Sequence, residues 1–455
     1  VYKRQILSFA EENSSKTFLS GDFYNGKNTS KKIALWIKKE LYKSTFNTII
    51  IGGGPAGTGL LMKSIKDGTI DQFLSKGLCL IEASDILVTG QLVNYQVNSD
   101  TYSNVFLECL DGAAENKFDL ERLNPAIRSF KQFEGDSIPL AQTSLLLDEI
   151  GLQLTEIINQ YEASTVSFNT VVTEVHENRD GTFRVISGNN QTFQAKNLVV
   201  ACGGIPKPLQ IDKNYRSKTI HSDQLIKGGA DKEINELNPE EKIIIIGGSH
   251  SAFSAAHYLL ENHESLISEE HPIEIWAKEV PKLYFPNPET ARELKYFDFT
   301  DEDVCHKTNR VFRLAGLRMD GRQLYMNMLG IGNDNREKRV VFRNINDSGQ
   351  IPIGVLKNAN LIIEAIGYRF NMPKFYNKDN VLMSFLGEET EHWVDEQCQL
   401  LLSDGSPLKN TFATGLASGF IPQGELGGEK SFKSQTNGLW YYQNLIAEMI
   451  LNRLK

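Results

Sequence analysis

Two segments of this chain share a pattern in which an apolar run leads into a turn and then a helix-compatible stretch. In the first, Thr48 to Ile51 precede residues 52–57, which have the form G-x-G-x-x-G. In the second, Ile243 to Ile246 precede residues 247–252, of the form G-x-S-x-x-A. Such strand–turn–helix units are typical of parallel α/β domains that bind dinucleotides. Two of them predict two dinucleotide cofactors and hydride transfer between them.

The first turn has glycine at each of the three positions that matter. Gly52 permits the tight turn, Gly54 lets the backbone approach a pyrophosphate, and Gly57 allows close helix–strand packing, whereas the alternative is a plain glycine-rich turn. The next apolar run, residues 78–81, ends in an acid placed to bind a ribose, after an interval that we attribute to a lengthened connection. The predicted residues of this site are Gly52, Gly54, Pro55, Ala56, Gly57 and Glu82.

The second turn predicts a phosphorylated nicotinamide cofactor. Ser249 adds a hydroxyl donor, and the following strand, Ile273 to Trp276, ends in Ala277-Lys278 rather than in an acid. A cation there would pair with a 2′-phosphate, which favours NADPH over NADH, although Lys278 is also explained as a solvated surface lysine. We expect His250 to contact the nucleotide rather than to act as a base. The predicted residues are Gly247, Ser249, His250, Ser251 and Lys278.

Composition narrows the class of partner. The chain has 455 residues and a formal net charge of -9, so no basic surface favours nucleic acid or an anionic membrane. Its five cysteines include no C-x-x-C pair, and its eight histidines show no metal-ligand spacing, so we expect no metal. We expect a cytoplasmic protein that acts on small molecules. Val1 stands where Met is usual, which leaves the true N-terminus open, and residues 1–45 contain no signal peptide.

Residues 1–45 are expected to form an N-terminal extension. Ile33, Trp36, Ile37 and Leu41 recur at helical spacing among lysines, which is typical of an amphipathic helix packed on its own domain or lying on a membrane surface.

The region between the two turns predicts a β-meander that ends in a buried strand. Its runs cover residues 165–174, 182–186, 191–195 and 198–201. The stretches "LVVACGGIPKP" and "LIIEAIGYRF" each end an apolar strand in a small residue, a variable one and Gly, and we interpret them as paired crossovers between domains.

With these features the chain resembles the two-dinucleotide-binding-domain flavoproteins, in which an NAD(P)H-binding domain is inserted into an FAD-binding domain. The resemblance covers most of residues 46–455 and implies an α/β fold with a glutathione-reductase-like FAD-binding Rossmann domain. "ATGLASG", which contains Gly415, resembles the final strand that carries the flavin to the domain junction. We expect the FAD-binding domain at 46–226 and 354–455, the NAD(P)H-binding domain at 227–353, and a substrate-lining insertion at 281–335.

Within this superfamily the missing cysteine pair disfavours the disulfide reductases. "GGIPKPLQ" followed by "TIHSDQL", with His221 and Ser222, resembles the linker of flavin-containing and N-hydroxylating monooxygenases. "GGSHSA" resembles the turn of the latter, with His250 where Gln is usual. "NSDTYSNVFLECL" resembles their segment near the flavin, where the usual Gln falls on Ser103, so the amine-hydroxylating subclass stays open.

The resemblance implies a reaction in which NADPH reduces FAD, O₂ forms a flavin hydroperoxide, and a small nucleophile, possibly an amine, is hydroxylated. Its site needs a dry pocket and a positioned substrate. The candidates beneath the flavin are Asn98, Ser99, Asp100 and Thr101, although a satisfied polar turn explains them equally well.

The C-terminal helix and the insertion supply the other candidates. Thr436 and Asn437 precede a helical pattern of Leu439, Tyr442, Leu445, Ile446 and Met449, whose N-terminus would face the flavin, and both also suit simple capping. Aromatic residues of the insertion are expected to line the substrate pocket: Tyr284, Phe285, Tyr296, Phe297, Phe299, Phe312 and Tyr325. The residues that could hold an acidic substrate group are Arg292, Lys295, Arg310 and Arg313, although most of them are also explained as solvated charges.

The function that this pattern favours is an FAD-containing, NADPH-dependent monooxygenase, possibly a homo-oligomer. The alternatives are an NAD(P)H-dependent flavin reductase or electron-transfer oxidoreductase, a single-component flavin halogenase, and a flavin-binding scaffold without turnover.

Overall fold

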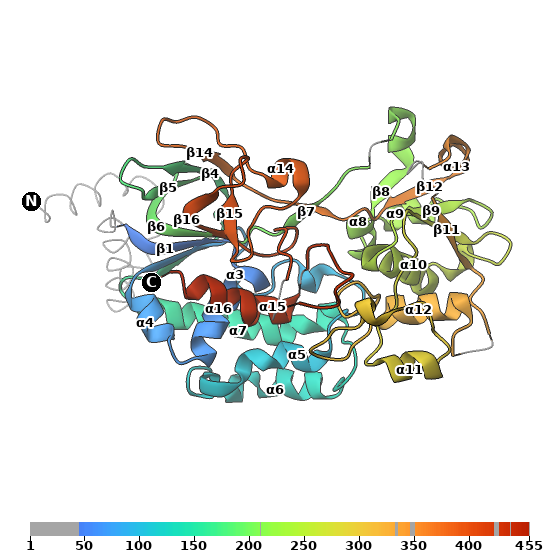
Figure 1. Ribbon diagram of the computed structural model, residues 1–455, viewed down its shortest axis with the longest axis horizontal. Helices are drawn as coiled ribbons and strands as arrows, with labels where there is room; N and C mark the ends of the chain where they lie inside the picture. Colours follow the sequence, from blue (N-terminus) through green and yellow to red (C-terminus); the bar gives the residue numbers. More distant parts are fainter. Residues whose placement is uncertain are drawn as a thin grey trace, which may run out of the picture. The chain divides into compact units, whose positions relative to one another are not determined.

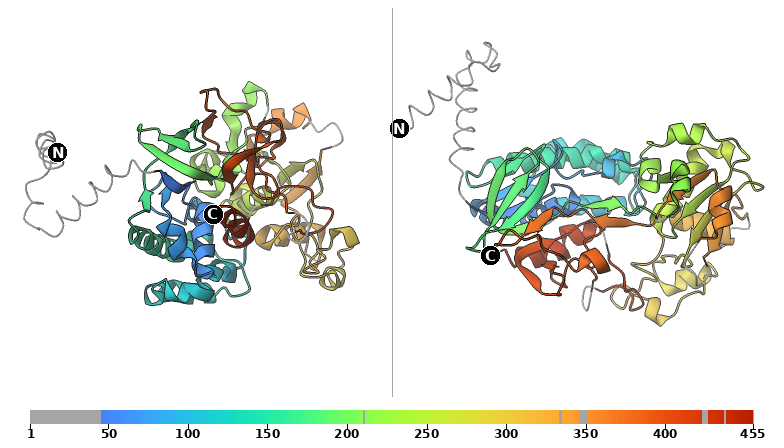
Figure 2. Two further views of the ribbon diagram at one scale, coloured as in Figure 1. Left: turned by 60° about the vertical axis from the view of Figure 1, so that its left-hand side comes forward. Right: turned by 90° about the horizontal axis from the view of Figure 1, so that it is seen from above.

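The computed structural model describes residues 45–209, 211–332, 335–345, 351–422, 427–436 and 438–454. The helix predicted around Trp36 and the predicted site residue Asn437 lie outside these ranges. Residues 46–455 form one compact unit that contains two main β-sheets, which lie at opposite ends of its long axis in Figure 1 and in the right-hand view of Figure 2.

The first sheet has a parallel core in the order β3-β2-β1-β6-β16. All four residues of β2 are buried, because helices and strands cover both faces of a parallel sheet and apolar runs are needed there. The predicted strands at 48–51 and 78–81 are confirmed. The strands are β1 (Phe46–Ile51), β2 (Leu78–Ile81), β3 (Thr165–Ser167), β6 (Thr192–Val200) and β16 (Pro407–Ala413), with β15 (Gln399–Leu401) antiparallel to β16.

The predicted β-meander is confirmed with two changes, one of which is that the runs 191–195 and 198–201 form a single strand, β6. The run 165–174 is not one strand, because Asn169 has a left-handed φ of 51° and separates β3 from β4. β4 (Val172–Glu177), β5 (Phe183–Ser187) and the first half of β6 pair antiparallel, and β14 (Lys374–Tyr376) adds to β4.

The second sheet is parallel throughout, in the order β11-β10-β9-β12-β8. Its strands are β8 (Thr219–His221), β9 (Ile243–Ile246), β10 (Ile273–Ala277), β11 (Val340–Asn344) and β12 (Leu361–Glu364). The expected domain boundaries would leave β8 and β12 with the first sheet, whereas both belong to the second. By strand pairing, the second domain therefore begins before β8 and ends after β12, so both boundaries lie nearer to the two connecting segments.

The two connecting segments between the sheets pair with each other. β7 (Gly204–Pro206) and β13 (Tyr368–Phe370) form an antiparallel two-stranded ribbon. The similar ends of two strands predicted paired crossovers between the domains. These two crossovers therefore lie side by side.

Most helices of the first half lie on one side of its sheet in Figure 1, and α14 (Gly387–Thr390), which follows β14, lies on the other. The others are α3 (Pro55–Lys66), α4 (Ile70–Ser75), α5 (Ser103–Leu107), α6 (Leu120–Lys131), α7 (Ser144–Asn159), α15 (Leu439–Gln443) and α16 (Leu445–Leu451). α15 packs closely on α3, because a Cβ added at Gly59 would lie 2.4 Å from the carbonyl oxygen of Tyr442. The predicted single C-terminal helix is wrong, since Asn444 leaves the helical conformation at φ -127° and ψ -91°.

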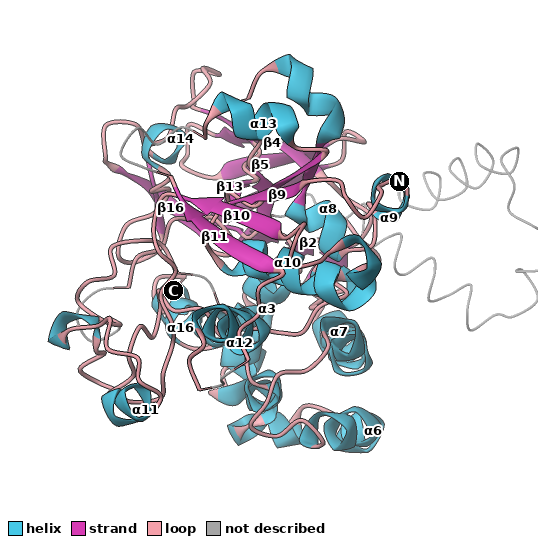
Figure 3. Cartoon of the chain, turned by 90° about the vertical axis from the view of Figure 1, so that its right-hand side faces the viewer, coloured by secondary structure: helices cyan, strands magenta, loops and turns pink. Residues whose placement is uncertain are grey.

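Helices of the second half surround its sheet, with α10 and α12 packed together beside it (Figure 3). They are α8 (Ser222–Ile226), α9 (Asp231–Asn235), α10 (His250–Asn262), α11 (Pro288–Glu293), α12 (Met319–Leu329) and α13 (Ile353–Asn358). In the described part of the chain, no helix combines the length and apolar character needed to cross a membrane.

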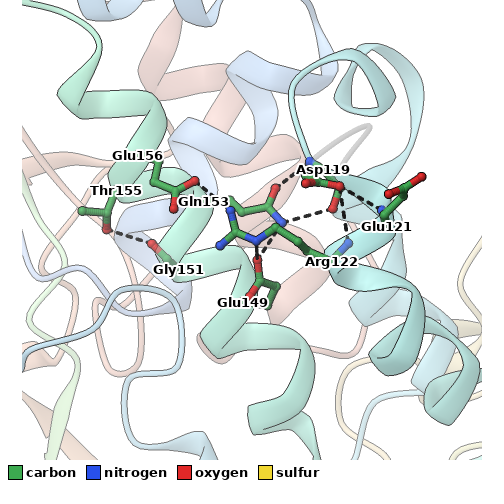
Figure 4. A network of polar contacts seen from close by, with 8 residues as sticks. All are labelled: Asp119, Glu121, Arg122, Glu149, Gly151, Gln153, Thr155 and Glu156. Atoms are coloured by element: carbon green, nitrogen blue, oxygen red, sulfur yellow. Dashed lines mark hydrogen bonds and ion pairs between the residues drawn. The ribbon is translucent and has the colours of Figure 1, made fainter.

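A polar network joins α6 to α7 (Figure 4). Arg122 pairs with Glu149 at 2.6 Å and with Glu156 at 2.9 Å, while Gln153 bonds both the N–H and the carbonyl of Asp119. Exposed ion pairs of this kind contribute about 0–1 kcal/mol each, so the network orients α7 more than it stabilises the fold.

The orientation of α7 affects the first glycine turn. Gly151 of α7 brings the helix against the backbone of Leu87, because a Cβ there would lie 2.4 Å from its carbonyl oxygen. The next residue, Val88, has a φ of 76° and donates its N–H to the carbonyl of Gly53 at 2.7 Å. A β-branched residue in that region is strained, and such strain persists where the surrounding structure enforces it.

Candidate active site

The glycines of the first turn are required by close backbone contacts. Gly52 has a φ of 103°, and a Cβ there would lie 2.3 Å from the carbonyl oxygen of Ala201. A Cβ at Gly57 would lie 1.9 Å from the carbonyl oxygen of Gly52. Real Cβ atoms do not approach so closely, so neither position accepts a side chain in this conformation.

The N-terminus of α3 is left open toward an anion. Gly54 stands at the N-cap with no capping side chain, Pro55 follows, and no acid lies in the first turn. By contrast, α6 is capped by Asp119 and carries Glu121 in its first turn. The free N–H groups and the positive end of the helix dipole of α3 therefore suit the pyrophosphate of FAD.

Glu82 is held at the end of β2 beside this turn. One carboxylate oxygen accepts the N–H of Gly53 at 2.5 Å, and the other accepts the N–H and the hydroxyl of Ser84 at 2.8 and 2.9 Å. The long interval between turn and acid contains α4, which agrees with a lengthened connection. Glu82 is half-buried and keeps acceptor capacity for a ribose.

The chain returns to this turn after β16. Gly415 has a φ of 106°, and a Cβ there would lie 3.2 Å from the Cβ of Ala56. Thr436 is buried and donates its N–H to the carbonyl of Phe420 at 2.8 Å. The following helix, α15, has five residues, so it offers a smaller dipole than the long helix that we expected.

The second turn repeats the geometry of the first. Gly247 has a φ of 135°, and a Cβ there would lie 2.1 Å from the carbonyl oxygen of Ala365. Ser249 is the N-cap of α10 and makes no capping hydrogen bond, and no acid lies in the first turn of this helix. The ring atom Nε2 of His250 is buried and has no hydrogen-bond partner among the described residues. An open helix start and an orphaned donor or acceptor fit a nicotinamide nucleotide.

Lys278 and Lys282 follow β10 and line the cavity beside this turn. Lys278 is exposed and makes no ion pair within the described ranges. Lys282 lies 3.8 Å from Asp298 and stacks over Phe312.

One large cavity, about 2260 Å³, connects the second turn to the C-terminal segment. Its walls include residues 247–251 of the second half and residues 435–436 and 438–441 of the first. A typical small-molecule pocket is about 300–1,000 Å³, so this cavity has room for a nicotinamide nucleotide and a further ligand.

The four residues predicted beneath the flavin separate into two groups. Asn98 donates to Asp320 of α12 at 2.9 Å, and the hydroxyl of Ser99 accepts the N–H of Thr101 at 2.9 Å, so these contacts are structural. Asp100 and Thr101 line the cavity. Burial raises the pKa of the Asp100 carboxyl, and Asp320 adds to this, while His250 and Arg318 oppose it.

The aromatic residues of the insertion do not line the pocket as a group, which corrects the expectation. Phe285, Tyr296, Phe299 and Tyr325 stack among themselves or on neighbouring rings, mostly in the core, and Phe297 is 68% exposed. Of the seven named aromatic residues, only Phe312 lines the cavity.

The cationic residues of the insertion divide in the same way. Arg310 and Arg313 line the cavity, whereas Arg292 stacks on Phe299 and Lys295 stays exposed, and neither lines it. The sequence reasoning missed Arg318 and Tyr441, which also line this cavity. The many cationic residues between 307 and 318 could have indicated Arg318. No local pattern distinguishes Tyr441 from a tyrosine of the core.

Comparisons with known proteins agree with this fold. Residues 46–268 match the family model described as pyridine nucleotide-disulphide oxidoreductase. A relative, CMP-5′-(3-aminopropyl)phosphonate hydroxylase from Streptomyces rubellomurinus (strain ATCC 31215), is 23% identical over 428 residues, which cover 90% of this chain and 97% of the relative.

Two solved structures have the same fold. L-lysine 6-monooxygenase from Pseudomonas syringae matches with a TM-score of 0.51 and 16% identity, over 90% of this chain and 98% of its own. Ornithine hydroxylase from Pseudomonas aeruginosa matches with a TM-score of 0.52 and 15% identity, over 90% of this chain and 100% of its own. The chain therefore has the fold of the two-dinucleotide-domain flavoproteins.

Proposed function

We propose that this two-dinucleotide-domain flavoprotein is an NADPH-dependent monooxygenase that hydroxylates the nitrogen of a small amine. FAD would bind at the first turn, through Gly52, Gly54, Gly57 and Glu82, and NADPH at the second, through Gly247, Ser249, His250 and Lys278. When bound, FAD supplies the activation of O₂. The proposal includes the route of oxygen activation that the resemblance to flavin-dependent monooxygenases implies.

One observation carries the proposal: a single cavity is walled both by the second glycine turn and by residues 435–436 and 438–441, which lead into α15. A nicotinamide and an amine can therefore share one cavity. The reaction balances as amine, O₂, NADPH and a proton giving hydroxylamine, water and NADP⁺. The names of the relatives, which denote an aminopropylphosphonate hydroxylase and lysine and ornithine oxygenases, support nitrogen as the target.

Asp100 is the residue best placed to handle the amine. Its carboxyl lines the cavity, has no ion pair within 4.0 Å among the described residues, and has a pKa raised by burial. An ammonium group must lose a proton before its nitrogen can attack an electrophilic oxygen, and a carboxylate with a raised pKa both attracts the ammonium ion and accepts its proton.

Plain reduction is distinguished from hydroxylation by its product. The purified, FAD-loaded protein would be given NADPH, ¹⁸O₂ and candidate amines, and the products analysed by mass. A hydroxylamine that carries one labelled oxygen per NADPH consumed supports the proposal. Hydrogen peroxide as the sole oxygen product, with every amine recovered unchanged, would reject it in favour of a flavin reductase.

A further inference from the structure

Several cationic side chains line the wall of the cavity formed by the insertion. Lys307, Arg310, Arg313, Arg318 and Lys433 all line it. For Arg310, Arg313 and Arg318, no carboxylate oxygen lies within 4.0 Å in the described ranges. Burial lowers the pKa of Arg318 and the charge of Arg310 lowers it further, while Tyr284, Tyr102 and Asp100 oppose this shift. Arg313 and Arg318 are half-buried, whereas Lys307, Arg310 and Lys433 are exposed. Like charges at half-buried positions are costly unless an anion binds between them.

A buried hydroxyl beside these arginines has no partner in the part of the chain that the structure describes. Tyr441 of α15 is 6% exposed, and among the described residues nothing hydrogen-bonds its Oη. The guanidinium carbon of Arg313 lies 6.0 Å from the centre of its ring, and both Arg313 and Arg318 act on its charge. Buried hydroxyls are nearly always hydrogen-bonded, so this one indicates a ligand atom that accepts from it.

The loop that carries Arg313 is fixed in place rather than free to relax. The carboxylate of Glu429, itself buried, accepts the backbone N–H groups of Leu314 and Ala315 at 3.1 and 2.9 Å. Arg313 donates to the carbonyl of Gly427 at 3.2 Å, and Arg318 donates to the carbonyl of Arg313 at 2.6 Å. Donors held by such contacts are preorganised for a ligand.

We infer that the substrate is an amine that also carries a phosphate or phosphonate group, bound by Arg310, Arg313, Arg318 and the hydroxyl of Tyr441. The inference rests on the proposed amine hydroxylation for its reacting end. Three guanidinium forks and a hydroxyl exceed what the two oxygens of a carboxylate accept, whereas a phosphoryl group offers three oxygens in the geometry that arginine prefers. Asp100, in the same cavity, would hold the amine.

The 2′-phosphate of NADPH is a second source of the same chemistry. Lys278 and Lys282 follow β10, where that phosphate is expected, while Tyr441 belongs to a helix packed on the first half. We therefore assign Arg310, Arg313 and Arg318 to the substrate and Lys278 to the cofactor.

The anion subsite can be tested without any turnover. Propylphosphonate and butanoate, which lack an amine, would be titrated into the FAD-loaded full chain with NADP⁺ present, and their binding measured by calorimetry. We expect propylphosphonate to bind about tenfold more tightly than butanoate. Equal affinities, or no binding of propylphosphonate, would overturn the inference.

Two variants locate the subsite. Tyr441→Phe and Arg310→Ala should each weaken propylphosphonate binding about tenfold and leave the affinity for NADP⁺ unchanged. Tyr441→Phe should not lower the melting temperature, because the hydroxyl it removes has no partner among the residues that the structure describes. Arg292→Ala, a change in the same insertion outside the cavity, should have no effect. Weaker NADP⁺ binding in place of weaker phosphonate binding would assign the wall to the cofactor and reject the inference.

The same data separate this inference from the proposed function. If propylphosphonate binds as expected and no amine is hydroxylated, the subsite stands and the monooxygenase proposal fails. If amines without a phosphoryl group are hydroxylated with the same KM as their phosphonate counterparts, the monooxygenase stands and the subsite fails.

Discussion

The carboxylate of Glu82 accepts the backbone N–H of Gly53 at 2.5 Å, so the acid that ends β2 and the turn that follows β1 form one unit. Ser84 holds the other carboxylate oxygen through its N–H and its hydroxyl. A ligand bound at the turn would therefore meet a carboxylate already oriented by three donors, which lowers the entropy lost on binding.

Replacing this acid tests the FAD site. Glu82→Ala removes the acceptor for the ribose and leaves Gly53 without its partner, and hydrogen bonds to charged groups contribute about 1.5–3 kcal/mol each. We expect the Kd for FAD to rise at least about tenfold, measured by titrating FAD into apoprotein. Glu82→Gln keeps one acceptor oxygen, so its Kd for FAD should lie between those of the parent and Glu82→Ala. Unchanged FAD affinity in Glu82→Ala would place the flavin elsewhere.

Adding one methyl group at Gly57 tests the turn itself. Gly57→Ala places a Cβ 1.9 Å from the carbonyl oxygen of Gly52, so the turn must open or the helix must shift. We expect loss of bound FAD and a destabilisation of about 1–3 kcal/mol, read from flavin absorbance and thermal unfolding. Gly354→Ala in α13 is the matched control, because nothing lies within 4 Å of its Cβ. A yellow, fully stable Gly57→Ala protein would contradict the assignment.

Much of the architecture was predictable because buried parallel strands leave a clear signal. The runs at 48–51 and 243–246 consist of β-branched residues, the run at 78–81 is apolar, and each is a strand in the structure. The break at Asn444 was not predictable, since the apolar spacing of a helix continues across it. Periodicity reports which face is buried and does not report whether the backbone stays helical.

The arginine and tyrosine residues that line the cavity were harder to predict than the two glycine turns. Glycine turns are local, so their chemistry can be inferred from spacing, whereas Arg318 and Tyr441 come from segments far apart in the chain and meet only through tertiary packing. The aromatic residues of the insertion misled for a related reason. Composition alone does not distinguish rings that pack on each other, such as Phe285 and Tyr296, from rings that face a cavity.

Lys278 should determine the choice of nicotinamide cofactor. If its ammonium group pairs with the 2′-phosphate, Lys278→Ala should raise the KM for NADPH about tenfold and leave the KM for NADH nearly unchanged. The effect should shrink at high salt, because the site is exposed. Lys338→Ala, which removes an exposed lysine paired with Glu269, is the control. Equal changes for both cofactors would show that Lys278 does not read the phosphate.

Asp100 should couple folding stability to pH. Burial raises the pKa of its carboxyl, so the folded state holds this proton more tightly than the unfolded state does. The resulting stabilisation is present below the ordinary pKa of aspartate and is lost as the pH rises through the raised value. Asp100→Asn should therefore melt at a higher temperature than the parent at pH 8, and the difference should narrow toward pH 4.

The same variant tests the role of Asp100 in the reaction. Without the carboxylate the amine keeps its proton, so hydroxylamine formation should fall at least about tenfold, while NADPH oxidation continues and releases hydrogen peroxide. Asp379→Asn, which removes an exposed carboxylate outside the cavity, should change neither the product ratio nor the pH dependence of melting. If Asp100→Asn melts at a higher temperature and still hydroxylates the amine fully, burial of Asp100 explains its effect on stability but Asp100 does not deprotonate the substrate. The two effects separate because the change in stability requires only that the carboxyl is buried, whereas the change in activity requires its contact with the amine.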